Sequence, residues 1–102
     1  MIRVIATIEL FQGRRDQFLE IFHALVPKVR AEQGCLDYRP MVDLATSISA
    51  QTPMRPDVVT IVEAWETLDA LETHLMAPHM LDYRKAVKDL VKDVALQVLQ
   101  PA

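Results

Sequence analysis

The fold is decided by the stretch VVTIVEAWETLDALETHLMAPHMLDY, which runs from Val58 to Tyr83. Its first eight residues, Val58 to Trp65, are almost continuously apolar, which is typical of a strand buried on both faces. The leucine spacing that follows predicts a short helix over Leu68–Met76. Pro78 ends that helix and opens a second one, because proline fits the first turn of a helix. The stretch also holds most of the groups able to bind or titrate a small molecule: Glu63, Trp65, His74, His79 and Tyr83.

The residues before this stretch predict a strand and a long helix. Apolar residues alternate over Ile2–Leu10, which indicates a strand with one face in the core. A helix is expected over about 14–32, since Phe18, Phe22 and other apolar residues follow at helical spacing. Pro27 predicts a kink inside it, and Gly34 is expected to end it as a C-terminal cap.

Three further segments complete the chain. Cys35–Val42 predicts a strand at a sheet edge, because Pro40 cannot donate a hydrogen bond to a neighbouring strand. Residues 43–57 form the least regular segment, with a brief strand possible at 47–51, and a connection of this length is often functional. Alternating apolar residues over 94–98 predict the last strand, which ends before Pro101.

The predicted order of strand, helix, strand, strand, broken helix and strand is that of a ferredoxin-like α+β fold. Residues 1–102 are expected to form a single domain with one antiparallel sheet and the helices on one face. The strand from Val58 has apolar residues on both faces, with Val62 on one and Ile61 on the other. Helices on one side would leave the second face bare, which is unusual for a monomer. We therefore expect a homodimer in which two sheets close into a dimeric α+β barrel.

Composition excludes several classes of function. The net charge is −3 and the basic residues are scattered, with adjacent pairs at Arg14–Arg15 and Arg84–Lys85 only, so there is no basic stripe for nucleic acid. No apolar run approaches the ~20 residues of a membrane span, and the N-terminus lacks the pattern of a signal peptide. Cys35 is the single cysteine. A cytoplasmic protein without internal disulfides, and with no membrane partner, is expected.

Several short motifs together resemble one known family. They are VRAEQGCLDY at 29–38, PMVD at 40–43, IVEAW at 61–65, THLMAPHM at 73–80 and the ending VLQPA. In their order and spacing they resemble the antibiotic biosynthesis monooxygenase domain, and within it the bacterial quinol monooxygenase group. The resemblance implies a dimeric ferredoxin-like α+β barrel. It also implies oxidation of a quinol by O₂ without metal, haem or flavin.

The resemblance leaves other functions open. Haem-degrading relatives use an Asn, a Trp and a His at positions that align with Thr7, His74 and Arg84 here, so haem cleavage is not expected. Other relatives isomerise small phosphorylated sugars and carry a histidine pair like His74 and His79. An isomerase using Arg84 to hold an anion is therefore an alternative, as is a non-catalytic module that binds small aromatic compounds.

Six residues are the candidates for a site that takes a small aromatic substrate and O₂. His74 is predicted to be the catalytic base, because an imidazole can exchange protons at neutral pH, and Glu63 is predicted to orient it. A half-buried histidine bonded to a backbone carbonyl is the structural alternative. The predicted substrate-binding residues are Trp65, Tyr38, Tyr83 and His79, although packing alone would also explain the aromatic ones.

No metal site is expected, since His74 and His79 lack the i, i+4 spacing of a zinc helix. Cys35 has no histidine or basic residue nearby in sequence and is expected to be a buried small residue, not a nucleophile.

Overall fold

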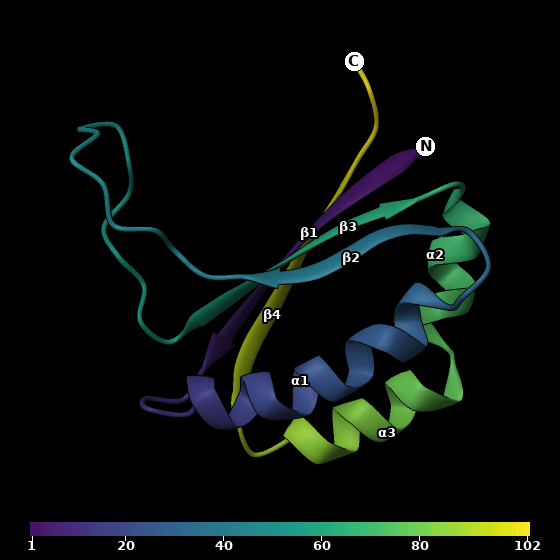
Figure 1. The fold of residues 1–102 in the computed structure, drawn as a ribbon, viewed down its shortest axis with the longest axis horizontal. Coiled ribbons are helices and arrows are strands. Elements are labelled where there is room, and N and C mark those ends of the chain that lie inside the picture. The colour runs from purple at the N-terminus through teal and green to yellow at the C-terminus, as the bar shows by residue number, and fades with distance from the viewer.

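A single four-stranded antiparallel sheet forms one layer of the protein (Figure 1). The computed structural model describes all 102 residues. The strands are β1 (Ile2–Leu10), β2 (Cys35–Met41), β3 (Val58–Trp65) and β4 (Val91–Leu99), in the spatial order β2-β3-β1-β4. The helices are α1 (Arg15–Arg30), α2 (Leu68–Leu75) and α3 (Pro78–Val87). This architecture confirms the predicted ferredoxin-like α+β fold.

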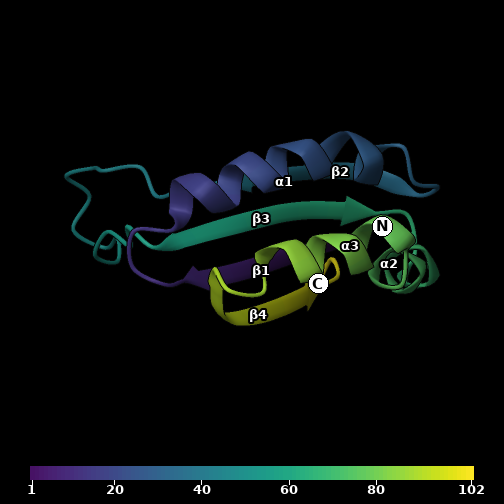
Figure 2. The same cartoon turned by 90° about the horizontal axis from the view of Figure 1, so that it is seen from below.

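The three helices form a second layer on one face of the sheet (Figure 2). The core lies between the layers, where β1 and β3 pair with Ala6 opposite Ile61. Phe18 and Phe22 of α1 pack there with Trp65, and all three side chains are buried. The alternation read from the sequence thus gives each strand one face turned to the helices.

The opposite face of the sheet has no helix over it. Ile5 pairs with Val62 there, Thr7 pairs with Thr60, and all four remain partly exposed. Apolar and β-branched side chains at the centre of an uncovered sheet face fit a second sheet. The homodimer stays a prediction.

β4 is the least covered strand on the helix side. Val94, Leu96 and Val98 pair with the core residues of β1, yet they are 50%, 47% and 51% exposed. Figure 2 shows the reason, because the helices lie over the other strands and leave much of β4 bare. The side chains of β4 that face the helix layer are therefore accessible to solvent.

The predicted end of α1 needs adjustment, while the kink expected at Pro27 stays a prediction. The helix continues through Pro27 to Arg30 and is capped by Ala31. Gly34, the predicted cap, lies further on in the turn before β2, with φ of +84°. Its left-handed backbone is used by the turn and not by the helix end, because the chain must reverse there within a few residues.

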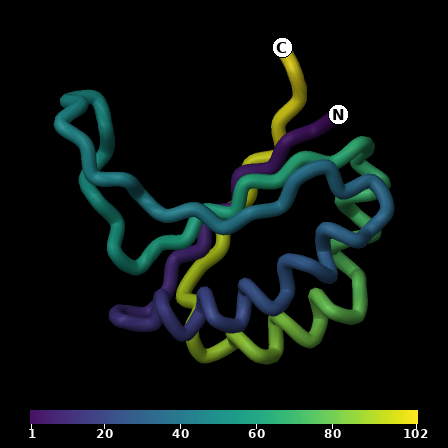
Figure 3. The backbone as a smooth tube through the Cα atoms, viewed as in Figure 1, coloured from purple at the N-terminus to yellow at the C-terminus, as the bar shows by residue number.

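The connection between β2 and β3 extends away from the two layers (Figure 3). It forms no strand at 47–51, and the segment bends through a turn near Ala50 instead. Arg55 closes its base with hydrogen bonds from Nε and Nη2 to the Asp43 carboxylate at 2.9 and 2.7 Å. Gln51 donates to the carbonyl of Leu44 at 2.6 Å. These contacts replace the pairing that a strand would have supplied.

Candidate active site

A cavity of about 440 Å³ lies between the sheet and α3. Its volume falls within the range usual for small-molecule sites. Twelve of its sixteen lining residues are hydrophobic, so the walls suit an apolar, flat guest. They come from all four strands and all three helices, and include Ala6, Ile61, Phe22, Met80, Val87 and Leu96.

Four of the six predicted site residues line this cavity. They are Glu63, His74, Tyr38 and Tyr83, which come from β3, α2, β2 and α3. Trp65 and His79 were also predicted to contact the substrate, but neither lines the cavity. Trp65 is fully buried beneath His74, and His79 lies on the outer side of α3.

His74 is held in a fixed orientation on α2. The side chain of Thr67 caps this helix by accepting from the backbone N–H of Ala70 at 3.1 Å. The imidazole is 1% exposed and packs between two aromatic rings, with centroids 4.7 Å from Trp65 and 5.4 Å from Tyr38. These contacts leave the ring little freedom to rotate.

The hydrogen bonds of His74 decide which nitrogen faces the cavity. Nδ1 lies 2.8 Å from Oε2 of Glu32. Because an ionised carboxylate can only accept, the proton of the neutral imidazole sits on Nδ1. Nε2 makes no hydrogen bond within the protein and keeps its lone pair. Since no fully buried side-chain nitrogen lacks a partner, Nε2 is the accessible nitrogen of the ring. Burial lowers the pKa of His74, while the Glu32 carboxylate opposes that effect. The ring is therefore a neutral base at pH 7.

Glu63 does not orient His74, contrary to the prediction. Its Oε1 accepts a hydrogen bond from Nε1 of Trp65 at 2.9 Å. The two side chains are two residues apart on one strand, so they point to the same face and meet there. Burial raises the pKa of Glu63 to about 7, against the hydrogen bond from Trp65. Glu63 is thus a second group in the cavity wall that can exchange a proton near neutral pH.

Glu32 was missed by the sequence analysis. It lies in the turn after α1 and is 42 residues from His74 along the chain. The motif VRAEQGCLDY contains it, but nothing in the local pattern separates it from a solvated carboxylate. A contact of such long range becomes visible only when the turn and α2 are packed together.

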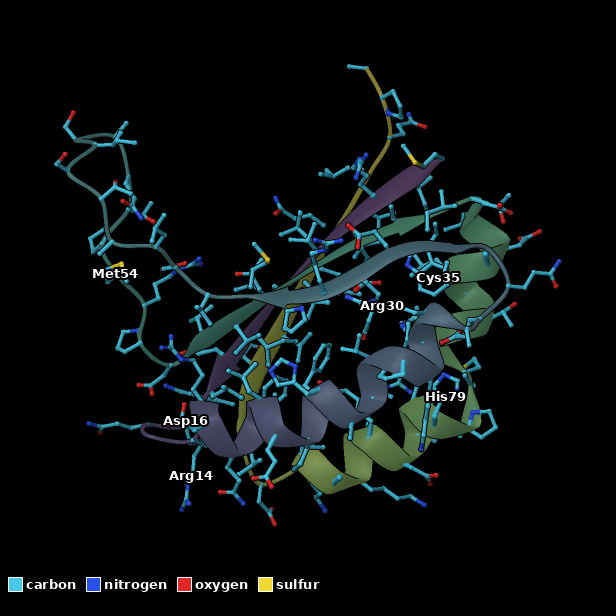
Figure 4. The ribbon with its side chains drawn as sticks, in the orientation of Figure 1. Arg14, Asp16, Arg30, Cys35, Met54 and His79 are labelled. Atoms are coloured by element: carbon cyan, nitrogen blue, oxygen red, sulfur yellow. The ribbon has the colours of Figure 1, made fainter.

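His79 contacts the same carboxylate from the other side. Its Nε2 lies 2.8 Å from Oε2 of Glu32. Figure 4 shows His79 on the first turn of α3, at the same end of the molecule as Arg30 and Cys35. One oxygen of Glu32 thus bonds to Nδ1 of His74 and to Nε2 of His79. No group of three or more His, Cys, Asp or Glu has the arrangement of a metal site.

The two tyrosines form the aromatic part of the wall. Phe22 stacks on Tyr38 with centroids 5.6 Å apart and meets the edge of Tyr83 at 5.7 Å. Burial raises the pKa of both phenols, so they stay protonated at neutral pH. They can pack against a guest ring and donate a hydrogen bond to its oxygen. Burial also raises the pKa of Cys35 to about 11, which agrees with its reading as an unreactive thiol.

Comparison with known proteins identifies the family. The profile described as "Antibiotic biosynthesis monooxygenase" matches residues 1–86. The chain belongs to the antibiotic biosynthesis monooxygenase family. The "Probable quinol monooxygenase YgiN" of Escherichia coli K12 is 43% identical over 103 residues, which cover 99% of this chain and 98% of that protein.

Solved structures of this family share the fold. The Rv0793 structure from Mycobacterium tuberculosis has a TM-score of 0.80 and 26% identity, covering 99% of this chain and 94% of that one. PA3566 from Pseudomonas aeruginosa has a TM-score of 0.80 and 28% identity, covering 99% and 93%. Family membership indicates a monooxygenase-type function. None of the helices has the length and hydropathy that crossing a membrane requires.

Proposed function

We propose that this protein oxidises a quinol or a related dihydroxyaromatic compound with O₂, without a metal, haem or flavin. The observation that carries the proposal is a neutral imidazole, fixed by a carboxylate behind it, in the wall of an otherwise apolar cavity. The printed name of the Escherichia coli relative supports the choice of a quinol.

In the proposed reaction His74 removes a phenolic proton. A phenol has a pKa near ~10, so a neighbouring base raises the fraction of phenolate at neutral pH. General-base assistance of this kind is worth typically ~10²–10⁴-fold. The phenolate is the electron-rich form that can pass an electron to O₂, and an apolar cavity keeps that charge away from bulk water.

The overall reaction balances without a further reductant. One oxygen atom replaces a ring hydrogen as a hydroxyl group, and the other leaves as water. The four electrons that O₂ accepts come from hydroxylating the ring carbon and from oxidising the quinol to the quinone. His74 takes the phenolic proton at Nε2 and returns it to the departing oxygen, so the protein ends unchanged. Tyr38 and Tyr83 pack on the ring, and Glu63 offers a second exchangeable proton.

The test is oxygen consumption by a reduced naphthoquinol, prepared without air and then mixed with oxygenated buffer and protein. We expect a rate well above that of buffer, a hydroxylated quinone as product, and loss of the rate in His74→Gln. The matched control is His23→Gln, since His23 is exposed on α1 and outside the cavity. A wild-type rate no faster than buffer would remove this proposal.

One observation favours a second candidate, an isomerase of a small phosphorylated metabolite. Arg84 and Lys88 lie one turn apart on or just after α3 and both line the cavity. Two cations could hold a phosphate while His74 and Glu63 move a proton. The mainly hydrophobic lining counts against a polar metabolite. Binding of a sugar phosphate that is abolished in Arg84→Gln, with no oxygen uptake on any quinol, would favour the isomerase.

A further inference from the structure

One carboxylate oxygen lies between two imidazole rings at the end of the helical layer. Oε2 of Glu32 is 2.8 Å from Nδ1 of His74 and 2.8 Å from Nε2 of His79. The side chains of the three residues are 13%, 2% and 23% exposed, respectively. The cluster therefore connects a buried ring in the cavity wall with a ring at the protein surface.

The backbone fixes Glu32 at this point. Its N–H donates to the carbonyl of Val29 at 2.9 Å, and its own carbonyl accepts from the N–H of Cys35 at 3.2 Å. Gly34 then brings the turn against α2, because a Cβ at Gly34 would lie 2.6 Å from the Cβ of Ala70. Packing this close presents the Glu32 carboxylate to the side of α2 that carries His74.

We propose that Glu32 is a positioning residue that fixes the tautomer of His74, and that His79 holds Glu32 in place for this task. The effect on the rate rests on the proposed function. The tautomer of His74 does not, because it is a property of the protein without substrate. Glu32 does not line the cavity, so it acts on the substrate only through His74.

The chemistry follows from the two ring nitrogens. A base that faces the substrate through Nε2 must carry its proton on Nδ1, and a carboxylate acceptor at Nδ1 selects that tautomer. When Nε2 takes up the substrate proton, the ring becomes an imidazolium, and the negative charge of Glu32 stabilises it. This is the general arrangement of a base oriented by a third group.

The other groups around His74 cannot replace Glu32. Tyr38 and Trp65 pack on the ring through their aromatic faces and edges. Glu63 is bonded to Trp65. Arg84, like a protonated His79, adds positive charge that disfavours the imidazolium. Glu32 is therefore the one partner that both accepts from Nδ1 and favours the charged ring.

His79 has the position needed to restrain Glu32. A glutamate in a partly exposed turn has several rotamers, and most of them would turn its carboxylate toward water. The hydrogen bond from Nε2 of His79 selects the rotamer that also meets His74. The surface groove between α1 and α3, which His79 lines, leaves the rest of this ring in contact with solvent.

The first experiment measures the His74 tautomer by ¹H–¹⁵N NMR of the imidazole nitrogens at a pH where the ring is neutral. We expect a proton on Nδ1 and none on Nε2 in the wild type. Glu32→Gln should keep this tautomer, because an amide oxygen still accepts, but should move the His74 titration to lower pH. Glu32→Ala should lose the fixed tautomer. A wild-type His74 protonated on Nε2 would overturn the proposal whatever the enzyme does.

The second experiment measures kcat and KM for naphthoquinol oxidation. Glu32→Gln should lower kcat by about tenfold or more, which is part of the ~10²–10⁴-fold that a general base supplies, with KM nearly unchanged. His79→Leu should also lower kcat, and His79→Gln should restore part of it because its amide can donate to Glu32. His23→Gln is the control.

The results separate this inference from the proposed function. If His74→Gln abolishes oxidation while Glu32→Gln leaves kcat and the His74 titration unchanged, the positioning role is wrong and the proposed function stands. If no variant or wild type oxidises a quinol, the proposed function fails, and the tautomer and titration still decide the role of Glu32. Should Glu32→Ala fail to fold, Glu32→Gln and His79→Leu carry the same test.

Discussion

The carboxylate of Glu63 accepts a hydrogen bond from the indole N–H of Trp65, two residues further along the same face of β3, at 2.9 Å. The bond satisfies one oxygen of a carboxylate that is almost fully buried. One neutral donor compensates only part of the cost of burying a charge. The fold therefore favours the protonated form of Glu63.

Glu63→Gln should stabilise the protein at alkaline pH. Burial raises the pKa of Glu63 from 4.5 to about 7, so the folded state binds more protons than the unfolded state between these values. The wild type then loses stability as pH rises from about 4.5 to 7, and the full penalty remains above pH 7. Glutamine keeps the acceptor for Trp65 and carries no charge.

We expect the two proteins to be about equally stable at pH 4, and the variant to be more stable at pH 8 by about 1–3 kcal/mol. Urea unfolding at both pH values measures the difference. Glu72→Gln is the control, because Glu72 is exposed on α2. A stability difference that does not change with pH would show that folding does not raise the pKa of Glu63.

Quinol oxidation should continue at mildly acidic pH, because His74 stays unprotonated there and can still act as the base. Burial lowers the pKa of His74 below its usual 6.5, so Nε2 stays unprotonated as the pH falls toward that value. We expect the acid limb of kcat/KM, which reports the free protein, to begin below pH 6.5 and to disappear in His74→Gln, together with a loss of ~10²–10⁴-fold in rate. An acid limb that persists unchanged in His74→Gln would assign it to another group, with Glu63 the first to examine.

The sequence was sufficient for the architecture and for four of the sixteen residues that line the cavity. Alternation in β1 and the apolar run of β3 placed the strands, because the period of a side-chain pattern follows directly from backbone geometry. It also placed Glu63 and Trp65 on one face. The sequence could not show that these two side chains bond to each other, because a donor from a distant part of the chain could equally have reached Glu63.

The remaining part of the site depends on tertiary packing. Glu32 meets His74 and His79 because a turn, α2 and α3 converge, and no local pattern encodes that convergence.

The exposure of β4 also depends on tertiary packing. Its apolar alternation predicted the strand, but burial of that strand depends on where the helices lie, and Leu96 stays half exposed at the cavity.

Gly34→Ala should destabilise the protein more than Gly13→Ala. Both glycines have a positive φ, +84° and +78°, which costs an L-residue about 1–2 kcal/mol. At Gly13 an added Cβ meets nothing within 4 Å, whereas at Gly34 it would lie 2.6 Å from the Cβ of Ala70. We expect an additional loss of about 1 kcal/mol or more at Gly34, since overpacking commonly costs 1–3 kcal/mol.

Thermal and urea unfolding of both variants measure this difference. The variant Gly34→Ala/Ala70→Gly removes the clash and should recover part of the extra loss, limited by the lower helix propensity of glycine. Equal destabilisation at the two glycines would contradict the close contact between the turn and α2.

Val62→Lys should convert the predicted homodimer into a monomer. Val62 lies opposite Ile5 at the centre of the sheet face that no helix covers, and both side chains are partly exposed. A lysine buried between two sheets would lose its hydration without gaining a partner for its charge. The free energy of that desolvation exceeds what packing the two sheet faces contributes. The same lysine in a monomer would simply extend into water, so the folded chain should survive.

Sizing by light scattering at micromolar concentration tests this directly, with circular dichroism as the check on folding. Leu81→Lys is the matched control, because Leu81 is 43% exposed on α3, in the helix layer away from the uncovered face. We expect the wild type and Leu81→Lys to be dimers and Val62→Lys to be a folded monomer. A wild type that is already monomeric would mean that the uncovered face of β1 and β3 tolerates water, and the barrel would have to be abandoned.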